Sequence, residues 1–293
     1  MTTTTTLCGR PVAADRALVM AIINRTPDSF YDRGASFDDD AARRRIEQVV
    51  VEGADIVDIG GVKAGPGESV DAAAEADRVV GFIAWVRTNF PDVVISVDTW
   101  RASVAELACD AGADLINDTW AGADPGLVEV AARRGAGLVC SHTGGAVPRT
   151  RPHRVRYGDT STGIVDAVVA ELGAAAARAL AAGVPADGIV IDPTHDFGKN
   201  THHGLALLRH TDRLVATGYP VLMALSNKDF VGETLGVELE ERVAGTLAAT
   251  ALAAEHGARI FRAHEVAPTR RVVEMAAAIT GRRAPVRAVR GLA

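Results

Sequence analysis

The chain has few cysteines and no long apolar run, and each shortage excludes a class of protein. Its 293 residues include only three cysteines, whose number and spacing fit neither a disulfide framework nor a zinc site. We therefore expect a reduced, cytoplasmic environment. No run reaches the ~18 consecutive apolar residues of a membrane span. Residues 1–6 lack the basic segment and apolar stretch of a secretory signal, so none is expected.

The chain also has no excess of positive charge and contains few aromatic residues. Lysine and arginine number 31 against 37 acidic residues, a net charge of −6, so we expect no partner among nucleic acids or acidic membranes. Aromatic residues make up only 4% of a chain that is 48% hydrophobic and contains 29 glycines. This composition is typical of tightly packed α/β proteins rich in small residues. The length suits one large barrel or two ordinary domains.

Short apolar runs recur along the chain and alternate with helical patterns. They predict strands near residues 17–24, 55–61, 93–98, 114–118, 137–142, 189–193, 220–226 and 259–264. Continuous apolar runs are typical of buried parallel strands. Eight of them alternating with helices predict a single (β/α)8 TIM barrel, of class α/β. We place the barrel over residues 11–281, between a disordered N-terminus (1–10) and a basic C-terminal tail (282–293).

Nearly every apolar run ends in a polar residue that can do chemistry. The carboxyl ends of all strands of such a barrel meet on one face, where the active site lies. We therefore expect one pocket to collect Asn24, Asp98, Asn117, Asp192, Lys228, Arg262 and His264.

Simpler structural roles remain open for some of these residues. Asp98 follows a strand and could merely cap the next helix. Arg262 and His264 could merely pair with Glu265 or Glu233.

These motifs resemble those of the dihydropteroate synthases, and the resemblance covers nearly the whole chain. It rests on six segments in the right order, at residues 24–30, 96–99, 116–118, 192–199, 226–232 and 262–264. The resemblance implies a transferase reaction of folate biosynthesis that joins 6-hydroxymethyl-dihydropterin pyrophosphate to p-aminobenzoate. Pyrophosphate leaves first, a pterin cation forms, and the arylamine attacks.

The resemblance also implies how the pterin is held. Carboxylates and an amide read the ring edge and stabilise the developing cation. Lys228 bonds the ring carbonyl, and Arg262 stacks on the ring and faces the pyrophosphate. The implied pterin-binding set is Asp98, Asn117, Asp192, Phe197, Lys228 and Arg262.

For the rest of the site, the resemblance implies Lys228, Arg262 and His264 as catalytic residues. Asn24 joins Arg262 and His264 around the pyrophosphate and binds Mg²⁺, an ion that prefers a few protein oxygens plus phosphate. The acceptor pocket is assigned to Phe30, Pro66 and Ser226. A homodimer is implied, because the family commonly pairs through its last helices.

The second loop departs from the family pattern. The family usually has Gly-Gly-Glu-Ser-Thr-Arg-Pro-Gly, whereas residues 60–67 read Gly-Gly-Val-Lys-Ala-Gly-Pro-Gly. Ala64 and Gly65 thus replace the Thr and Arg that help close over the pyrophosphate. Loss of one preorganised donor costs ~10²–10³ in rate. Lys63 offers a point charge from nearby, which does not replace a bidentate guanidinium.

Other changes lie at the same end of the predicted barrel. The sixth loop has Thr194-His195-Asp196 where Gly-x-Gly is usual, and Asn227 replaces an arginine. The remaining changes are Arg25, Tyr31 and Arg33 in the first loop and Ser141 at the fifth strand end.

These substitutions favour a divergent second copy of the synthase that is inactive or only weakly active. Two alternatives stay open. One is a working synthase with a rearranged second loop; the other is a pterin-site protein with a different acceptor or a non-catalytic binding role. Catalysis survives if Lys63, Arg25 or Arg33 reaches the pyrophosphate. A corrinoid methyltransferase is disfavoured, because it would leave the anion site at Arg262 and His264 without a purpose.

Overall fold

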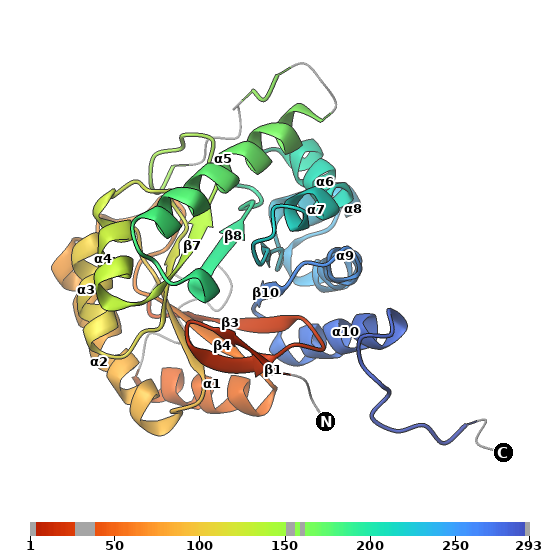
Figure 1. The fold of residues 1–293 in the computed structure, drawn as a ribbon, viewed down its shortest axis with the longest axis horizontal. Helices are drawn as coiled ribbons and strands as arrows, with labels where there is room; N and C mark the ends of the chain where they lie inside the picture. Colours follow the sequence, from red (N-terminus) through yellow and green to blue (C-terminus); the bar gives the residue numbers. More distant parts are fainter. Residues whose placement is uncertain (1–3, 27–38, 151–155, 159–161, 291–293) are drawn as a thin grey trace.

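Eight parallel strands form a nearly closed barrel in the computed structural model, which describes residues 4–26, 39–150, 156–158 and 162–290. The sheet order is β8-β7-β6-β5-β4-β3-β10-β9, and a parallel bridge between Ile191 and Val221 joins its two ends. The predicted TIM barrel is confirmed (Figure 1). The strands are β3 (Leu18–Asn24), β4 (Ile56–Gly60), β5 (Val94–Asp98), β6 (Leu115–Asp118), β7 (Gly137–Ser141), β8 (Ile189–Asp192), β9 (Leu222–Ala224) and β10 (Ile260–Ala263).

The helices surround the barrel, with α2, α3 and α4 on one side and α6 to α10 on the other (Figure 1). Local chemistry sets several of their ends. The Asp71 carboxylate accepts a hydrogen bond from the Ala74 amide at 2.8 Å and starts α2, and Gly135 ends α4 with a φ of 64°. The helices are α1 (Asp39–Val51), α2 (Ala72–Asn89), α3 (Ala102–Asp110), α4 (Gly126–Arg134), α5 (Gly163–Ala181), α6 (Thr201–Arg209), α7 (Thr211–Val215), α8 (Asp229–Leu235), α9 (Val243–Glu255) and α10 (Val266–Ile279).

The strands carry two separate hydrophobic layers, because successive side chains point to opposite faces of a sheet. In β4, Val57 and Ile59 pack outward against the helices, while Ile56 joins an inner cluster. The same inner cluster contains Leu115 of β6 and Val190 of β8. The lower half of the barrel interior is therefore apolar and closely packed.

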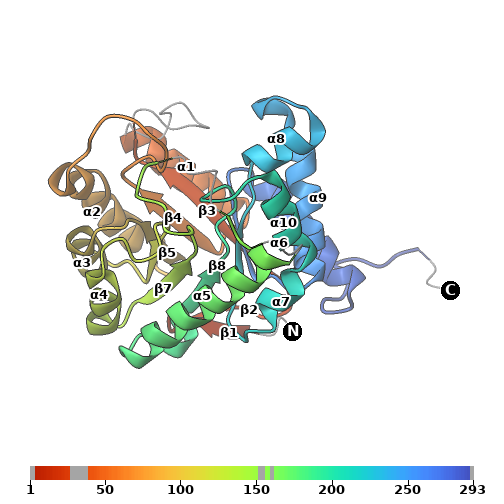
Figure 2. The ribbon, with the colours of Figure 1, turned by 90° about the horizontal axis from the view of Figure 1, so that it is seen from above.

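A short hairpin covers the N-terminal end of the barrel. Strands β1 (Thr4–Leu7) and β2 (Arg10–Ala13) pair antiparallel, and their turn places Cys8 and Gly9 at positive φ. The hairpin lies at the end of the barrel opposite α8 (Figure 2), and its Leu7 and Val12 pack into the inner cluster. The prediction that residues 1–10 are disordered is wrong for residues 4–10, because these two side chains are buried in the barrel floor.

The C-terminal tail leaves the barrel after α10. Arg283 pairs with Glu274 at 3.4 Å, and the following residues up to 290 are exposed. In both views this segment extends away from the helices (Figures 1 and 2). Within the described residues, no helix is long and apolar enough to cross a membrane.

Candidate functional site

The interior of the barrel changes from apolar to polar along each strand. Asp58 lies two residues after Ile56 of the inner cluster, and Asp192 lies two residues after Val190 of the same cluster. Because side chains in a strand alternate with a period of two, these residues also face the interior. The same spacing adds Ser96, Asn117, Ser141 and Arg262 to this polar layer, and places Asn24, Asp98, Ser226 and His264 at the mouth above it.

Arg262 is the centre of a charged network in this layer. Its Nε lies 2.6 Å from Asp58 Oδ2, and its Nη2 lies 2.7 Å from Asp98 Oδ2. Asn117 Nδ2 also donates to Asp58 Oδ2 at 3.1 Å, and Ser96 donates to Asp58 Oδ1 at 2.6 Å. The guanidinium thus joins strands β4, β5 and β10 at the barrel mouth.

The two charges of the Arg262–Asp98 pair respond differently to burial. Burial raises the pKa of Asp98 to about 7, with Asp58 adding to the rise and Arg262 opposing it. Burial alone would lower the pKa of Arg262, but Asp58 and Asp98 together raise it. Arg262 therefore stays charged, and Asp98 can take up or release a proton near neutral pH.

This geometry excludes the simpler roles considered for Asp98 and Arg262. Helix α3 begins after Arg101 without a side-chain cap, and Asp98 instead accepts from Arg262 and from Thr119 Oγ1 at 2.9 Å. The carboxylates paired with Arg262 are Asp58 and Asp98, not Glu265 or Glu233. Both residues therefore belong to a shared polar site.

Lys228 and Phe197 contact each other in a second part of the site. The Lys228 ammonium lies 4.6 Å from the centre of the Phe197 ring, and Trp120 packs edge-on against that ring at 5.0 Å. Burial lowers the pKa of Lys228, against the pull of Asp196 and Asp192. Burial raises the pKa of Asp192 to about 6, although its carboxylate accepts from the Thr194 amide at 2.7 Å. An aromatic face thus stands beside titratable groups of both signs.

Asn24 is the last residue of β3 and His264 directly follows β10, and both are half-buried. Burial lowers the pKa of His264 to about 3, helped by Arg262 and Arg45. At neutral pH its imidazole is therefore neutral, and it offers a hydrogen bond rather than a charge to an anion. Among the described residues, no group of three His, Cys, Asp or Glu side chains could hold a metal ion.

The proposed acceptor pocket is only partly described. The Ser226 hydroxyl donates to Glu265 Oε2 at 3.0 Å and accepts from the His264 backbone amide at 3.2 Å. Pro66 is exposed on loop 2, the segment of residues 61–71 between β4 and α2. Phe30 lies outside the described residues, as do Tyr31 and Arg33.

Arg25 does not compensate for the arginine that loop 2 lacks. Its guanidinium stacks over the Phe82 ring of α2 at 4.8 Å and pairs with Asp39 at the start of α1. It is 6% exposed, and Nε also donates to the Arg78 carbonyl at 3.3 Å. These contacts lie in the helix layer outside the barrel. Arg25 is therefore a packing residue of the first loop.

Loop 6, residues 193–200, shows why glycine is usual at two of its positions. Thr194 and Asp196 have φ values of 50° and 69°, in the left-handed region that costs non-glycine residues ~1–2 kcal/mol each. Local hydrogen bonds offset this strain. The Thr194 hydroxyl donates to the Asp192 carbonyl at 3.0 Å, and Asp196 accepts from the Asp229 amide at 2.6 Å. Residues with side chains therefore hold the left-handed conformation at two positions where the family usually has glycine.

The burial of His195, which lies between these two positions, predicts that the protein loses stability in acid. Its imidazole is fully buried beside Phe230, and burial and Lys199 lower its pKa to about 3. Below the ordinary histidine pKa of ~6.5, His195 becomes protonated in the unfolded chain but stays neutral in the folded protein. The free energy of unfolding therefore falls by up to ~1.4 kcal/mol for each pH unit. Chemical denaturation between pH 7 and pH 4 should show a shallower loss for His195→Leu than for the unchanged protein. The exposed His202→Gln is the control, and equal slopes for His195→Leu and the unchanged protein would contradict the assignment.

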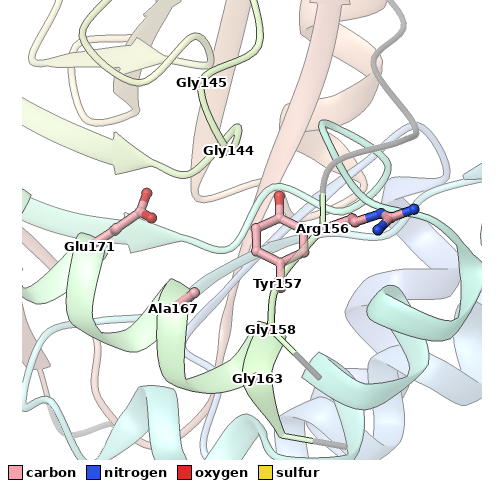
Figure 3. Close-up of a pocket in the computed structure, with 8 residues that line it drawn as sticks. All are labelled: Gly144, Gly145, Arg156, Tyr157, Gly158, Gly163, Ala167 and Glu171. Carbon is pink, nitrogen blue, oxygen red and sulfur yellow. The ribbon is translucent and has the colours of Figure 1, made fainter. Parts of the chain in front are cut away.

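Loop 5, residues 142–162 between β7 and α5, borders a cavity of about 500 Å³ beside the mouth. Gly144, Gly145, Tyr157 and Glu171 are among its lining residues, and Figure 3 shows Glu171 on helix α5 and Tyr157 on the segment that precedes this helix. None of the predicted site residues lines this cavity. Lys199 anchors the loop next to it by donating to the His142 carbonyl at 2.7 Å.

Asp58 is the main site residue absent from the sequence prediction. It is fully buried and accepts hydrogen bonds from three strands' side chains. The available signal was a charged residue inside the apolar run 56–59, which is costly unless the charge is paired. Thr119 and Trp120, which contact Asp98 and Phe197, carried no comparable signal.

The fold and site define a (β/α)8 barrel with a network of charged side chains at its strand ends and an aromatic ring, Phe197, beside Lys228. A family described as pterin binding enzymes matches residues 20–264. The chain belongs to this family.

Similar proteins include some named dihydropteroate synthase and some named inactive dihydropteroate synthase 2. "Inactive dihydropteroate synthase 2" of Mycobacterium leprae (strain TN) is 69% identical over 287 residues, covering 98% of this chain and 99% of the relative. The structure of Mycobacterium tuberculosis Rv1207 is 51% identical with a TM-score of 0.75, covering 97% of this chain and 99% of that one. A dihydropteroate synthase from Coxiella burnetii in complex with pteroic acid is 33% identical with a TM-score of 0.83, covering 94% and 98%. The chain is thus a divergent homologue of the dihydropteroate synthases.

Proposed function

We propose that this protein binds a pterin, with its pyrophosphate, at the barrel mouth and turns it over weakly or not at all as a dihydropteroate synthase. The observation that carries this proposal is the contrast between the two halves of the mouth. The residues assigned to the pterin form a connected network around Arg262. Loop 2, by contrast, has Ala64 and Gly65 where the family has threonine and arginine. The Arg25 guanidinium cannot replace that arginine, because it contacts Phe82 and Asp39. The name of the Mycobacterium leprae relative agrees with low turnover.

In this proposal Asp98, Asn117 and Asp192 face the pterin edge. Asp98, with a pKa raised by burial to about 7, can present either a donor or an acceptor to a ring nitrogen. Phe197 supports the ring from one side, and Lys228 beside it can donate to the ring carbonyl. Because Arg262 is already paired with two carboxylates, a pterin must share or displace one of those contacts.

Mg²⁺ fits the pyrophosphate half as a phosphate-bound ion rather than one held by a protein cage. Within the described residues there is no carboxylate and histidine cluster for it, and Asn24 supplies the oxygen chemistry that this ion accepts. Bound there, it would share the charge of the pyrophosphate. The neutral His264 would add a hydrogen bond at the same rim.

The first experiment measures pyrophosphate release from dihydropterin pyrophosphate with Mg²⁺, with and without p-aminobenzoate. Absent or very slow release from a folded protein that still binds the pterin is the expected result. Rapid release that depends on p-aminobenzoate would establish a working synthase instead. Release that is rapid only with another amine would establish a different acceptor.

Replacing Lys228 with alanine is expected to weaken pterin binding by roughly tenfold to a hundredfold, since hydrogen bonds from charged groups contribute ~1.5–3 kcal/mol. Quenching of pterin fluorescence measures the affinity. Lys228→Met keeps an unbranched side chain against Phe197 and removes only the ammonium, so it should lose most of the same affinity. Unchanged binding in both variants would remove Lys228 from the pterin pocket.

We also propose a homodimer formed through the last helices, in the cytoplasm. The support is a set of large apolar side chains that are exposed on these helices and on the tail, which a second copy of the chain would cover. They are Leu252 of α9, Met275 and Ile279 of α10, and Val286 and Val289 of the tail. Sedimentation at micromolar concentration tests the dimer, and a monomer alone would contradict it.

A further inference from the structure

Loop 5 reaches across the barrel mouth and holds loop 2 through one side chain. Arg149 Nε donates to the Gly65 carbonyl at 3.3 Å, and its Nη1 donates to the Glu68 carbonyl at 2.5 Å. The two loops are more than eighty positions apart in sequence. The contact falls on the position where loop 2 has glycine in place of the family's arginine.

The backbone of loop 5 is bent to make this contact. Gly144 and Gly145 have φ values of 61° and 81°, and the Ala146 amide closes a turn on the Thr143 carbonyl at 3.3 Å. Arg149 itself has a φ of 63°, which is costly for a residue with a side chain. A strained residue persists only where its surroundings hold it, and such residues cluster at binding sites.

Arg149 differs from other arginines around the mouth in its partners. Arg25 pairs with Asp39, Arg101 with Glu75, and Arg262 with two aspartates. Across the part of the chain that the structure describes, Arg149 has no carboxylate partner and its Nη2 carries no hydrogen bond. Backbone carbonyls accept its hydrogen bonds without cancelling its charge, so a half-buried positive charge remains at loop 2.

Lys63 brings a second cation to the same place. A Cβ added to Gly65 would have Lys63 Cε as its one neighbour within 4 Å, at 3.9 Å. The end of the lysine stem therefore lies in van der Waals contact with the point where the missing arginine side chain would begin. Two cations from two different loops meet around Gly65.

We propose that Arg149 replaces the arginine missing at Gly65 and binds, together with Lys63, a phosphate-type oxyanion at the mouth. Two of its N–H groups position loop 2, and the remaining ones face the anion. In the proposed function, on which this assignment rests, that anion is the pyrophosphate of the pterin ligand. Arginine suits this task, because its planar fork can hold carbonyls and an oxyanion at once.

The test is calorimetric binding of inorganic pyrophosphate with Mg²⁺ to the full chain at low salt. Arg149→Ala is expected to bind roughly tenfold to a hundredfold more weakly than the unchanged protein. Arg133→Ala, which removes an equal charge from an exposed position on α4, should bind as the unchanged protein does. Adding Gly65→Arg to Arg149→Ala should restore most of the lost affinity, because the charge returns to the same place.

The proposal is supported if the affinity for pyrophosphate falls in Arg149→Ala and recovers in the double variant Arg149→Ala, Gly65→Arg. Unchanged pyrophosphate binding in Arg149→Ala overturns it, even where hydrogen exchange in loop 2 becomes faster, since Arg149 would then only hold the loop. No binding by the unchanged protein overturns it as well.

A parallel titration with 6-hydroxymethylpterin, which carries no phosphate, separates this assignment from the proposed function. We expect Arg149→Ala to bind the pterin as the unchanged protein does and to lose binding of pyrophosphate. Absence of pterin binding alone would refute the pterin proposal and leave the anion site standing.

Discussion

Replacing Arg262 with alanine is expected to lower the free energy of unfolding by about 3–5 kcal/mol at neutral pH, the range typical of breaking a buried ion pair. Its guanidinium is the cation paired with both Asp58, which is fully buried, and Asp98, which is 20% exposed. Without it, two carboxylates face each other in the barrel interior. Urea denaturation of the folded variant measures the loss.

The pH dependence of that loss identifies its cause. Burial already raises the pKa of Asp98 to about 7, and removing Arg262 takes away the group that opposes the rise. A carboxyl with a raised folded pKa stabilises the folded state when protonated, and this stability disappears as pH rises through that pKa. The loss caused by Arg262→Ala should therefore be smaller at pH 5 than at pH 8.

A matched control separates burial from charge. Arg213 and Asp166 form a pair of similar length, 2.6 Å, with 42% and 54% of their side chains exposed. Arg213→Ala should cost no more than ~1 kcal/mol, as is usual for exposed pairs. A similarly small and pH-independent loss for Arg262→Ala would show that the network at the mouth contributes little to stability.

Restoring threonine and arginine at positions 64 and 65 is expected to raise pyrophosphate release that depends on p-aminobenzoate by ~10–10³-fold. The upper bound is the usual contribution of one preorganised donor. Gly65 does not have a positive φ, and a Cβ added there has one neighbour within 4 Å, Lys63 Cε at 3.9 Å, so the backbone accepts a residue with a side chain at this position. A pyrophosphate assay on the double variant Ala64→Thr, Gly65→Arg measures the effect.

The variant Ala64→Thr, Gly65→Gln is the control for this experiment. It adds similar side-chain volume without charge, so an increase confined to the arginine variant assigns the effect to the guanidinium. No increase in a folded arginine variant would mean that other changes at the mouth, such as Asn227, limit the reaction. Since Arg149 already supplies a cation at Gly65 in our proposal, the gain should lie toward the lower end of the range.

Much of the fold was determined by the sequence on its own. Apolar runs predicted every barrel strand to within a residue or two, because a strand buried on both faces must be apolar along its whole length. The residues at the strand ends, such as Asp98 and Arg262, were recognisable for the same reason: polarity begins where burial between two layers ends. The hairpin at residues 4–13 was missed, because only its packing on the barrel floor makes a threonine-rich segment fold.

Only the tertiary structure decided which charges are paired. Asp58 and Arg262 are 204 positions apart, and nothing local indicates that one compensates the other. The sequence alone allows Arg25 as a replacement for the lost arginine. The contact of its guanidinium with the Phe82 ring excludes that role. Arg149 of loop 5 donates to the Gly65 carbonyl of loop 2, 84 positions away in the sequence. The sequence determined where strands and polar residues occur, because burial and period are local; the partners of long side chains depend on which loops the closed barrel brings together.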